Sequence, residues 1–166
     1  MCHVHFEQFD QFDYNKNTMT PLLASLEFSR AKSALSELMT EVVHKHIPLV
    51  VSRHRGKEEM VLVGSDDLAR FLDSFRLDPR VTIDGSEVTA EVAQLGLLGF
   101  GETLEDAMED LVEELRAYAR DFFERASFYA ETDRAGHAPW LLRFALAPLD
   151  RQLELLYEDS RVAAAS

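Results

Sequence analysis

The segment FSRAKSALSELMTEVVHKHIPLVVSRHRGK, residues 28–57, decides the fold, and it is also a basic island in an acidic chain. It holds six Lys and Arg residues against two Glu residues, a local net charge of +4. The whole chain has a formal net charge of -13, so the other residues together carry -17. This asymmetry suggests that one part of the chain meets a polyanion while the rest has another role. Because charges more than about 8 Å apart are largely screened at physiological ionic strength, a segregated basic patch can work in an acidic protein.

The first part of the segment has the apolar periodicity of a helix. One face would hold Ala31, Leu35, Leu38, Met39, Val42 and Val43. This spacing predicts an amphipathic helix of about four turns from Ser29 to His46. Ser29 is the expected N-cap, because its hydroxyl can accept from a free amide of the first turn, and Pro48 stops helical continuation.

The second part of the segment predicts a β-hairpin. The apolar runs 49–51 and 60–63 flank a turn at residues 54–57 that contains Gly56. After the hairpin, Ser65 with two following aspartates is typical of the start of a short helix that ends near Asp73, because acidic residues favour the positive end of the helix dipole.

Length and composition are those of a soluble globular protein with one medium or two small domains. The 166 residues are 46% hydrophobic and 28% charged, so the chain can bury a core. The single cysteine, Cys2, excludes an intramolecular disulfide, and no apolar run approaches the roughly 20 residues that cross a bilayer. Residues 1–18 lack the features of a signal peptide. We therefore expect a cytoplasmic protein without a membrane association.

The N-terminal stretch, residues 1–20, is expected to be a flexible extension, and Met19 is a candidate natural start. Cys2, His3 and His5 could suggest a metal fragment, but no second ligand pair follows at zinc-finger spacing. We expect no metal and no cofactor.

A second unit is expected from about Val81. Residues 87–95 alternate between apolar and polar side chains, as in a half-buried strand. Gly96, Gly99 and Gly101 are interpreted as a turn that feeds a helix; the alternative, a phosphate loop, lacks the Lys and Ser/Thr that such a loop needs. Thr103 and Asp106 then form a capping-box-like start of the longest predicted helix, and a short helix is expected after Pro148.

The order of these elements resembles a known family. Residues 25–73 combine the S-R-A-K helix start, an I-P stop, a strand that ends in Ser-Arg, and an acidic-capped helix. In this they resemble the N-terminal domain of the Phd/YefM antitoxins of bacterial toxin–antitoxin modules. The resemblance implies a small α/β domain that dimerises through its sheet and helices and binds a palindromic operator of its own operon.

The same resemblance implies which residues meet DNA. The DNA-binding residues would be Ser29, Arg30, Lys32, Arg53, Arg55 and Lys57. Lys32 and Arg53 are the leading candidates. Many relatives have Arg at the position of Lys32, and because Lys acts as a point charge, bidentate guanine recognition is not expected there.

The following residues resemble a second antitoxin type. In VTAEVAQLGLLGFGETLEDAMEDLVEELRAYARDF, residues 88–122 and beyond, a strand leads through a Gly-x-Thr turn into a long helix, as in HicB-type antitoxins. We therefore predict an α+β fold with three parts. These are an extension at 1–20, a DNA-binding and dimerisation domain at 21–77, and a HicB-like unit at 81–160 that binds a toxin or has a regulatory role.

No constellation in the sequence supports catalysis, so we expect a binding protein: an antitoxin that neutralises a cognate toxin, represses its own operon and forms a homodimer or a higher oligomer. Its acidic half could cover the basic surface of an RNA-cleaving toxin. The candidate toxin-binding residues are Trp140, Leu141, Phe144, Leu149, Leu153 and Leu156, which could instead complete the core or the homodimer. Two alternatives stay open: a stand-alone transcription regulator whose second unit binds a ligand or stabilises the dimer, and an enzyme with an acidic metal-dependent site.

Overall fold

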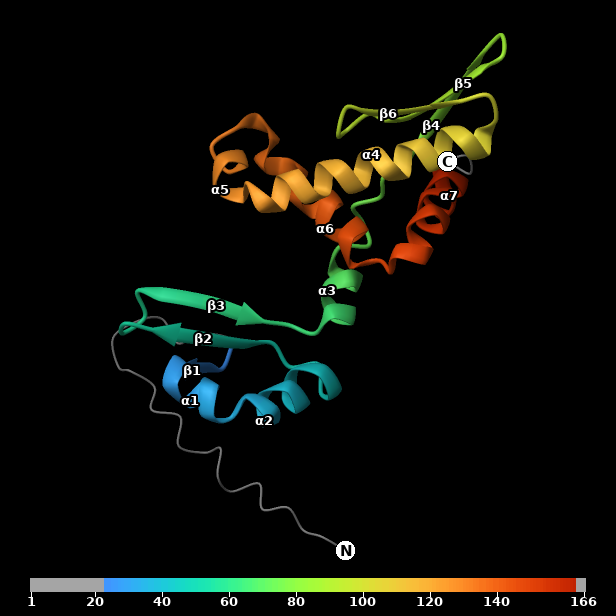
Figure 1. The fold of residues 1–166 in the computed structure, drawn as a ribbon. Coiled ribbons are helices and arrows are strands. Elements are labelled where there is room, and N and C mark those ends of the chain that lie inside the picture. The colour runs from blue at the N-terminus through green and yellow to red at the C-terminus, as the bar shows by residue number, and fades with distance from the viewer. Residues whose placement is uncertain (1–22, 164–166) are drawn as a thin grey trace, which may run out of the picture. The chain divides into compact units, whose positions relative to one another are not determined.

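The computed structural model describes residues 23–163, with side chains up to Ser160. The chain divides after Gly64 into two compact units, which we name unit 1 (residues 23–64) and unit 2 (residues 65–163). Each unit combines a three-stranded sheet with helices, so the predicted α+β class is confirmed (Figure 1). The predicted extension at 1–20, with Met19 and the Cys2, His3 and His5 group, lies outside the described residues.

Unit 1 is built on a sheet of β1 (Ser25–Glu27), β2 (Leu49–Arg53) and β3 (Glu58–Leu62). β2 and β3 form the predicted antiparallel hairpin, in which Arg53 pairs with Glu58 across the turn. The turn places His54, Arg55 and Gly56 in the left-handed region, at φ 53°, 59° and 78°. β1 was not predicted; it lies parallel to β2, with Leu26 beside Val51.

The helical run of unit 1 differs from the single helix predicted between Ser29 and His46. It consists of α1 (Phe28–Ser33), α2 (Leu35–Met39) and a π-helical turn at Thr40–His44. Ala34 interrupts it, at φ −111° and ψ 21°. The prediction of Ser29 as N-cap is also wrong, because β1 continues directly into α1 and leaves Glu27, in extended geometry, at the cap position.

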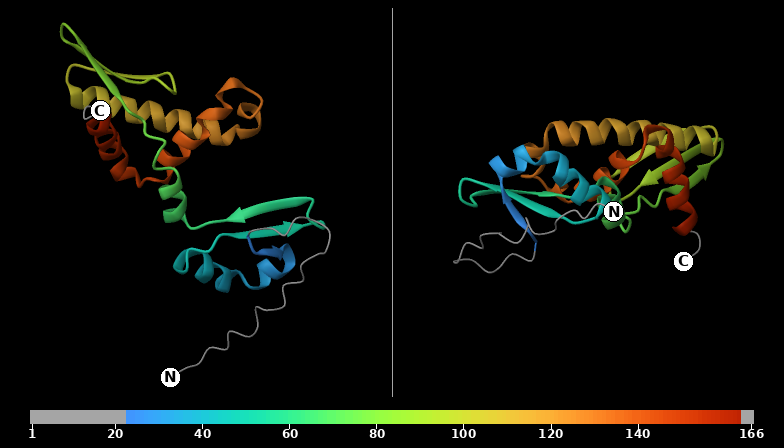
Figure 2. Two further views of the ribbon diagram at one scale, coloured as in Figure 1. Left: turned by 180° about the vertical axis from the view of Figure 1, so that it is seen from behind. Right: turned by 90° about the horizontal axis from the view of Figure 1, so that it is seen from below.

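The core of unit 1 lies between one face of the sheet and the helical run (Figure 2). It contains Leu26, Ala31, Leu38, Val42, Leu49 and Val51. The predicted helix stripe is therefore only partly covered, because Leu35, Met39 and Val43 are about half exposed, as are Met60 and Val61 on β3. A unit of this size that leaves so much apolar surface in water has a face suited to a protein partner.

Unit 2 contains a second sheet, the antiparallel meander β4 (Arg80–Asp84), β5 (Glu87–Val92) and β6 (Leu97–Gly101). The strand predicted at 87–95 is confirmed as β5 over residues 87–92, with Val88, Ala90 and Val92 buried on one face, and residues 93–96 form a turn. β4 was missed, although a two-residue Gly-Ser turn at 85–86, with Gly85 at φ 60°, is a known hairpin signal. The interpretation of residues 96–101 as a turn is wrong for 97–101, which form β6.

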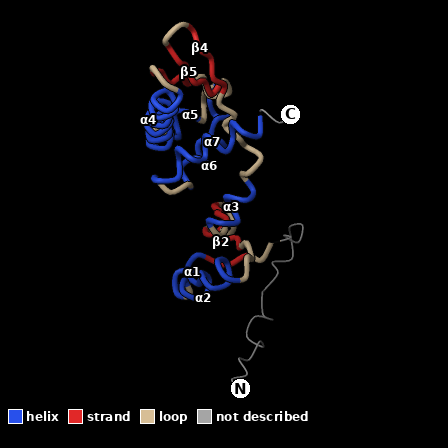
Figure 3. Tube along the Cα trace, turned by 90° about the vertical axis from the view of Figure 1, so that its right-hand side faces the viewer, coloured by secondary structure: helices blue, strands red, loops and turns tan. Residues whose placement is uncertain are grey.

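The long helix α4 (Leu104–Glu124) lies across β5 and β6 (Figure 3). Its start has the expected capping box, in which Thr103 and Asp106 bond to each other's backbone amides. The glycines of β6 serve this packing: a Cβ at Gly99 would collide with the backbone of Ala107 and Leu111, and one at Gly101 with that of Asp106 and Ala107. Glycine therefore lets the strand approach the helix closely.

Shorter helices complete unit 2. They are α3 (Ser65–Phe71), α5 (Ala126–Tyr129), α6 (Ala138–Leu146) and α7 (Gln152–Ala163), with 3-10 turns at Asp133–His137 and Leu149–Arg151. The core takes Leu77 and the inner face of β5, together with Leu111 and Leu115 of α4. α3 packs against α6 and belongs to unit 2, although residues 65–77 fall within the predicted DNA-binding domain at 21–77. The functional boundaries at 21–77 and 81–160 stay predictions.

Candidate functional site

The predicted DNA-binding residues come from three places in unit 1. Ser29, Arg30 and Lys32 lie on α1, Arg53 ends β2, and Arg55 and Lys57 lie in the β2–β3 turn. All six side chains are exposed to solvent. Ser29 is thus free of the capping role that the sequence suggested.

The parallel pairing of β1 with β2 brings these places together. Glu27, the last residue of β1, pairs with Ser52, so α1 starts beside the end of β2. The guanidinium of Arg53 accordingly lies over the ring of Phe28, 5.9 Å from its centroid. The start of α1, the end of β2 and the hairpin turn therefore lie at one end of unit 1. We name Arg30, Lys32, Arg53, Arg55 and Lys57 the basic end.

The cations of the basic end differ in their ionic partners. Arg53 forms an ion pair with Glu58, its cross-strand neighbour, and both side chains are about half exposed. Lys32, Arg55 and Lys57 form no ion pair within the described part of the chain. These three are therefore free to meet phosphate oxygens, while Arg53 is positioned by its strand, by Glu58 and by Phe28.

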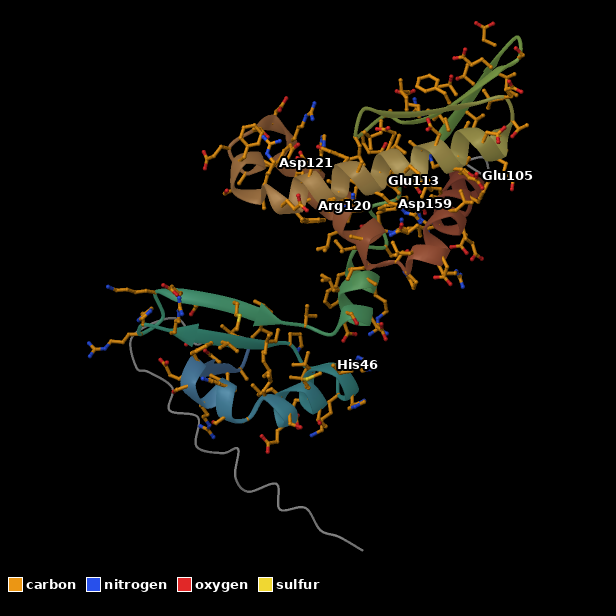
Figure 4. All side chains as sticks on the ribbon, in the orientation of Figure 1. His46, Glu105, Glu113, Arg120, Asp121 and Asp159 are labelled. Carbon is orange, nitrogen blue, oxygen red and sulfur yellow. The ribbon has the colours of Figure 1, made fainter. Side chains whose placement is uncertain are left out.

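Lys45, the sixth basic residue of the island, lies elsewhere. It follows the π-helical turn and pairs with Glu41 at 2.6 Å. Its neighbour His46 is left-handed, at φ 58°, and Figure 4 shows it at the end of the helical run away from the β2–β3 turn. The basic island of the sequence is thus divided, and Lys45 is a natural control for the basic end.

The predicted toxin-binding residues in unit 2 fall into two groups. Leu141, Phe144 and Leu156 are buried in the core of unit 2, which is the alternative role considered from the sequence. Leu149 is 72% exposed, and Trp140 and Leu153 are partly buried. Trp140 donates from its indole to the Arg76 carbonyl at 3.1 Å and meets Phe75 edge-to-face. In this conformation only the second group can touch a partner.

Unit 2 also carries most of the acidic charge. Residues 65–166 contain 22 Asp and Glu against 10 Arg and no Lys, a net charge of -12. Six of these acids lie between Glu105 and Glu114, in the first half of α4. Burial, with further contributions from the nearby Glu105 and Glu109, raises the pKa of Tyr157 on α7. Glu105 and Glu109 therefore lie on the side of α4 near α7.

An open groove of about 410 Å³ runs between α4 and α7. It is lined by Glu109, Asp110, Val112, Glu113, Arg116 and Leu153. Arg116 joins its two walls, because the guanidinium donates to Gln152 at 2.7 Å and to the Leu149 carbonyl at 2.8 Å. Sequence reasoning missed this groove, although the i, i+4 spacing of Glu109 and Glu113 places both carboxylates on one helix face.

A titratable cluster at the other end of α4 has a structural role. The hydroxyl of Tyr118 lies 2.7 Å from Nδ1 of His137, and Tyr129 donates to Asp121. Burial lowers the pKa of His137 and raises that of Tyr118, so both groups stay neutral near pH 7. The cluster connects α5 and the 3-10 turn at Asp133–His137 to the end of α4. This structural role accounts for the cluster without a role in chemistry on a substrate.

The described residues contain no group of His, Cys, Asp and Glu placed to hold a metal ion. His44 and His46 flank Lys45 at the end of the helical run, where cationic side chains suit the helix dipole. Among the described helices, none is both long and apolar enough to cross a lipid bilayer.

The comparison with protein families identifies the chain. The family PHD_like, described as "Antitoxin of toxin-antitoxin, RelE / RelB, TA system", matches residues 22–157, which include nearly all of both units. The chain belongs to this antitoxin family. No curated protein matches it.

A solved structure supports the antitoxin's fold. It comes from Syntrophomonas wolfei subsp. wolfei and is assigned as an antitoxin part of a toxin/antitoxin system. The TM-score is 0.70 at 16% identity, and the match covers 80% of this antitoxin and 96% of the other chain. At that identity the likeness concerns the arrangement of the helices and strands.

Proposed function

We propose that this antitoxin binds operator DNA through the basic end of unit 1 and neutralises a cognate toxin through unit 2. In this proposal unit 1 is a Phd/YefM-type domain, residues 81–160 form a HicB-like unit, and the protein represses its own operon. The observation that carries the DNA half is the meeting of α1, the end of β2 and the hairpin turn at one end of unit 1. Lys and Arg at such a place suit phosphate contacts, which supply much of DNA affinity.

A homodimer fits the surface of unit 1. Leu35, Met39 and Val43 on the helical run and Met60 and Val61 on β3 are about half exposed. Covering this apolar surface with a second copy would stabilise unit 1, at about 25 cal/mol for each Å² removed from water. Dimerisation would also double the number of cations offered to a palindromic site.

The DNA half is tested by titrating the full chain with DNA from upstream of its own gene, over a series of salt concentrations. We expect the logarithm of the association constant to fall linearly with log salt, and upstream DNA to bind more tightly than random DNA. A chain that ignores upstream DNA at low salt would refute this half of the proposal.

The toxin half rests on charge and on the exposed part of the predicted patch. A toxin that grips RNA needs a basic surface, and the acidic first half of α4 and the groove beside α7 can cover one. Leu153 lines the groove, and the Leu149 carbonyl accepts from Arg116 beside it. These two residues, and Trp140 on α6, are the candidate apolar contacts.

Co-expression tests the toxin half. We expect a small basic protein encoded beside the antitoxin gene to copurify with the full chain, and excess salt to weaken the complex because opposite charges steer it. Failure to copurify, together with retained operator binding, would favour a stand-alone transcription regulator.

A further inference from the structure

Strand β4 is an open sheet edge in unit 2. It is the first strand in the order β4-β5-β6, and every residue from Arg80 to Asp84 is exposed. The five residues pair with β5 without a bulge, and neither Pro nor Lys interrupts them. Natural proteins use bulges, prolines and lysines to protect edges that are meant to stay single. β4 has none of these protections.

The opposite edge of the same sheet is protected. The backbone amide of Phe100 on β6 donates to the Asp110 carboxylate of α4 at 2.9 Å. β4 has no comparable cover within the described part of the chain, since α4 packs on β5 and β6. The β4–β5 hairpin extends beyond α4, as Figures 1 and 2 show. Among the described residues the two edges are thus unlike: β6 is capped at Phe100, and β4 has no such hydrogen bond from a neighbouring element.

The sequence of β4, Arg-Val-Thr-Ile-Asp, is self-complementary in the antiparallel sense. If two copies pair with Thr82 on a two-fold axis, Arg80 lies opposite Asp84 of the second copy, twice. On the other face of the sheet Val81 lies opposite Ile83 of the second copy, also twice. Directly opposed side chains of an antiparallel pair are close enough to interact, so the charged pairs attract and the apolar pairs bury each other.

We propose that β4 pairs with β4 of a second copy of this chain in this register, which joins the two sheets into one of six strands. Three observations agree on it: the charge complementarity of Arg80 and Asp84, the unprotected edge, and the exposure of Val81 and Ile83. Ile83 is 71% exposed although it lies on the sheet face that α4 partly covers. The contact is isologous, the symmetry of most dimers, and it is separate from the apolar surface of unit 1.

Charge reversal tests the register. Arg80→Asp or Asp84→Arg turns two attractive charge pairs between the copies into two repulsive ones. We expect the association constant of the β4–β4 contact to fall about tenfold or more. The double variant Arg80→Asp/Asp84→Arg restores opposite charges across the axis and should restore association. Arg80 also faces Glu91 within its own sheet, so Arg80→Asp places two acids opposite each other inside one chain. If that intrachain repulsion caused the loss of association, the loss would persist in the double variant. Such a result would refute the proposed pairing.

Disulfide trapping gives a second readout on the full chain, without DNA or toxin. In a Cys2→Ser background, Thr82→Cys places one thiol from each copy at the axis, within the Cα separation of about 4.4–6.8 Å that a disulfide spans. We expect a covalent dimer on oxidation. The control Ser86→Cys, in the exposed β4–β5 turn, lies far from its counterpart in this register and should stay monomeric on the gel.

Equal cross-linking of the two cysteine variants, or none with Thr82→Cys, would overturn the β4 pairing. A toxin or other partner on β4 instead of a second copy would give the same negative result. Neither outcome bears on operator binding, which is measured by the salt dependence of the DNA titration, so failure of one proposal is distinguishable from failure of the other.

Discussion

Replacing Asp159 with Ala is expected to lower the free energy of unfolding of unit 2 by about 3–5 kcal/mol, because it leaves a buried arginine without its partner. Asp159 is fully buried on α7 and accepts from Arg143 of α6 at 2.7 and 2.9 Å. It also accepts from the backbone amide of Leu77 at 2.7 Å. One carboxylate therefore joins α6, α7 and the segment before β4.

Urea unfolding of the full chain measures this effect. Trp140 is the only tryptophan, and its contacts with Phe75 and Arg76 lie in unit 2, so its fluorescence reports the unfolding of that unit. Glu158→Ala is the matched control, because Glu158 is the exposed neighbour of Asp159 on α7. We expect this control to change the unfolding free energy by less than about 0.5 kcal/mol.

The double variant Arg143→Met/Asp159→Leu separates the net contribution of the ion pair to the unfolding free energy from the destabilisation caused by removing only one partner. Replacing both members of a buried ion pair by apolar residues is often neutral or stabilising, so much of the stability lost in Asp159→Ala should return. A small loss in Asp159→Ala, with Trp140 still reporting a cooperative transition, would show that water or Asp73 satisfies Arg143 instead. The Asp73 carboxylate lies 4.0 Å from the Arg143 guanidinium.

This ion pair illustrates what the sequence could not predict. Arg143 and Asp159 are 16 residues apart on two short helices, and no local pattern distinguishes them from the many exposed charges around them. Sequence patterns predicted correctly the elements whose contacts lie within a few residues along the chain. The β2–β3 hairpin, the strand β5 and the capping box of Thr103 and Asp106 follow from spacing within a few residues.

Prediction failed where long-range packing overrides local periodicity. The helical stripe from Ala31 to Val43 is continuous in sequence, yet the helix is interrupted at Ala34 and widens in the π-helical turn at Thr40–His44. The three-residue strand β1 is too short to show alternation. Leu141, Phe144 and Leu156 were predicted to bind a toxin, yet they are buried in the core of unit 2. Hydrophobicity alone cannot distinguish a core residue from an interface residue.

The candidate DNA site was predictable in its residues and not in its geometry. The charges of the basic end can be read from the sequence, but their meeting depends on the parallel β1–β2 contact, which brings Phe28 to Arg53. Lys45 is basic and only eight residues before Arg53, but it lies before the start of β2 whereas Arg53 ends that strand, so Lys45 does not belong to the basic end.

Removing Lys32 and Arg53 together is expected to weaken operator binding about ten-thousandfold or more near physiological salt, since charged contacts contribute about 1.5–3 kcal/mol each and a dimer loses four of them. In a dimer the double variant Lys32→Ala/Arg53→Ala removes four cations. At about 0.9 per phosphate contact, the slope of log K against log salt should become shallower by about 3.5. Arg53→Ala alone should cost more than Lys32→Ala, because it also leaves the Glu58 carboxylate unpaired beside the phosphates.

Two further variants make the DNA result specific. Lys45→Ala removes the same charge from the other end of the helical run, where Lys45 is paired with Glu41, and should leave the salt slope unchanged. Arg53→Lys keeps the charge but loses the planar fork, so the slope should hold while sequence preference declines if Arg53 reads a base. Both Lys32 and Arg53 are exposed, so folding should be unaffected. An unchanged slope and affinity in the double variant would remove Lys32 and Arg53 from the DNA interface.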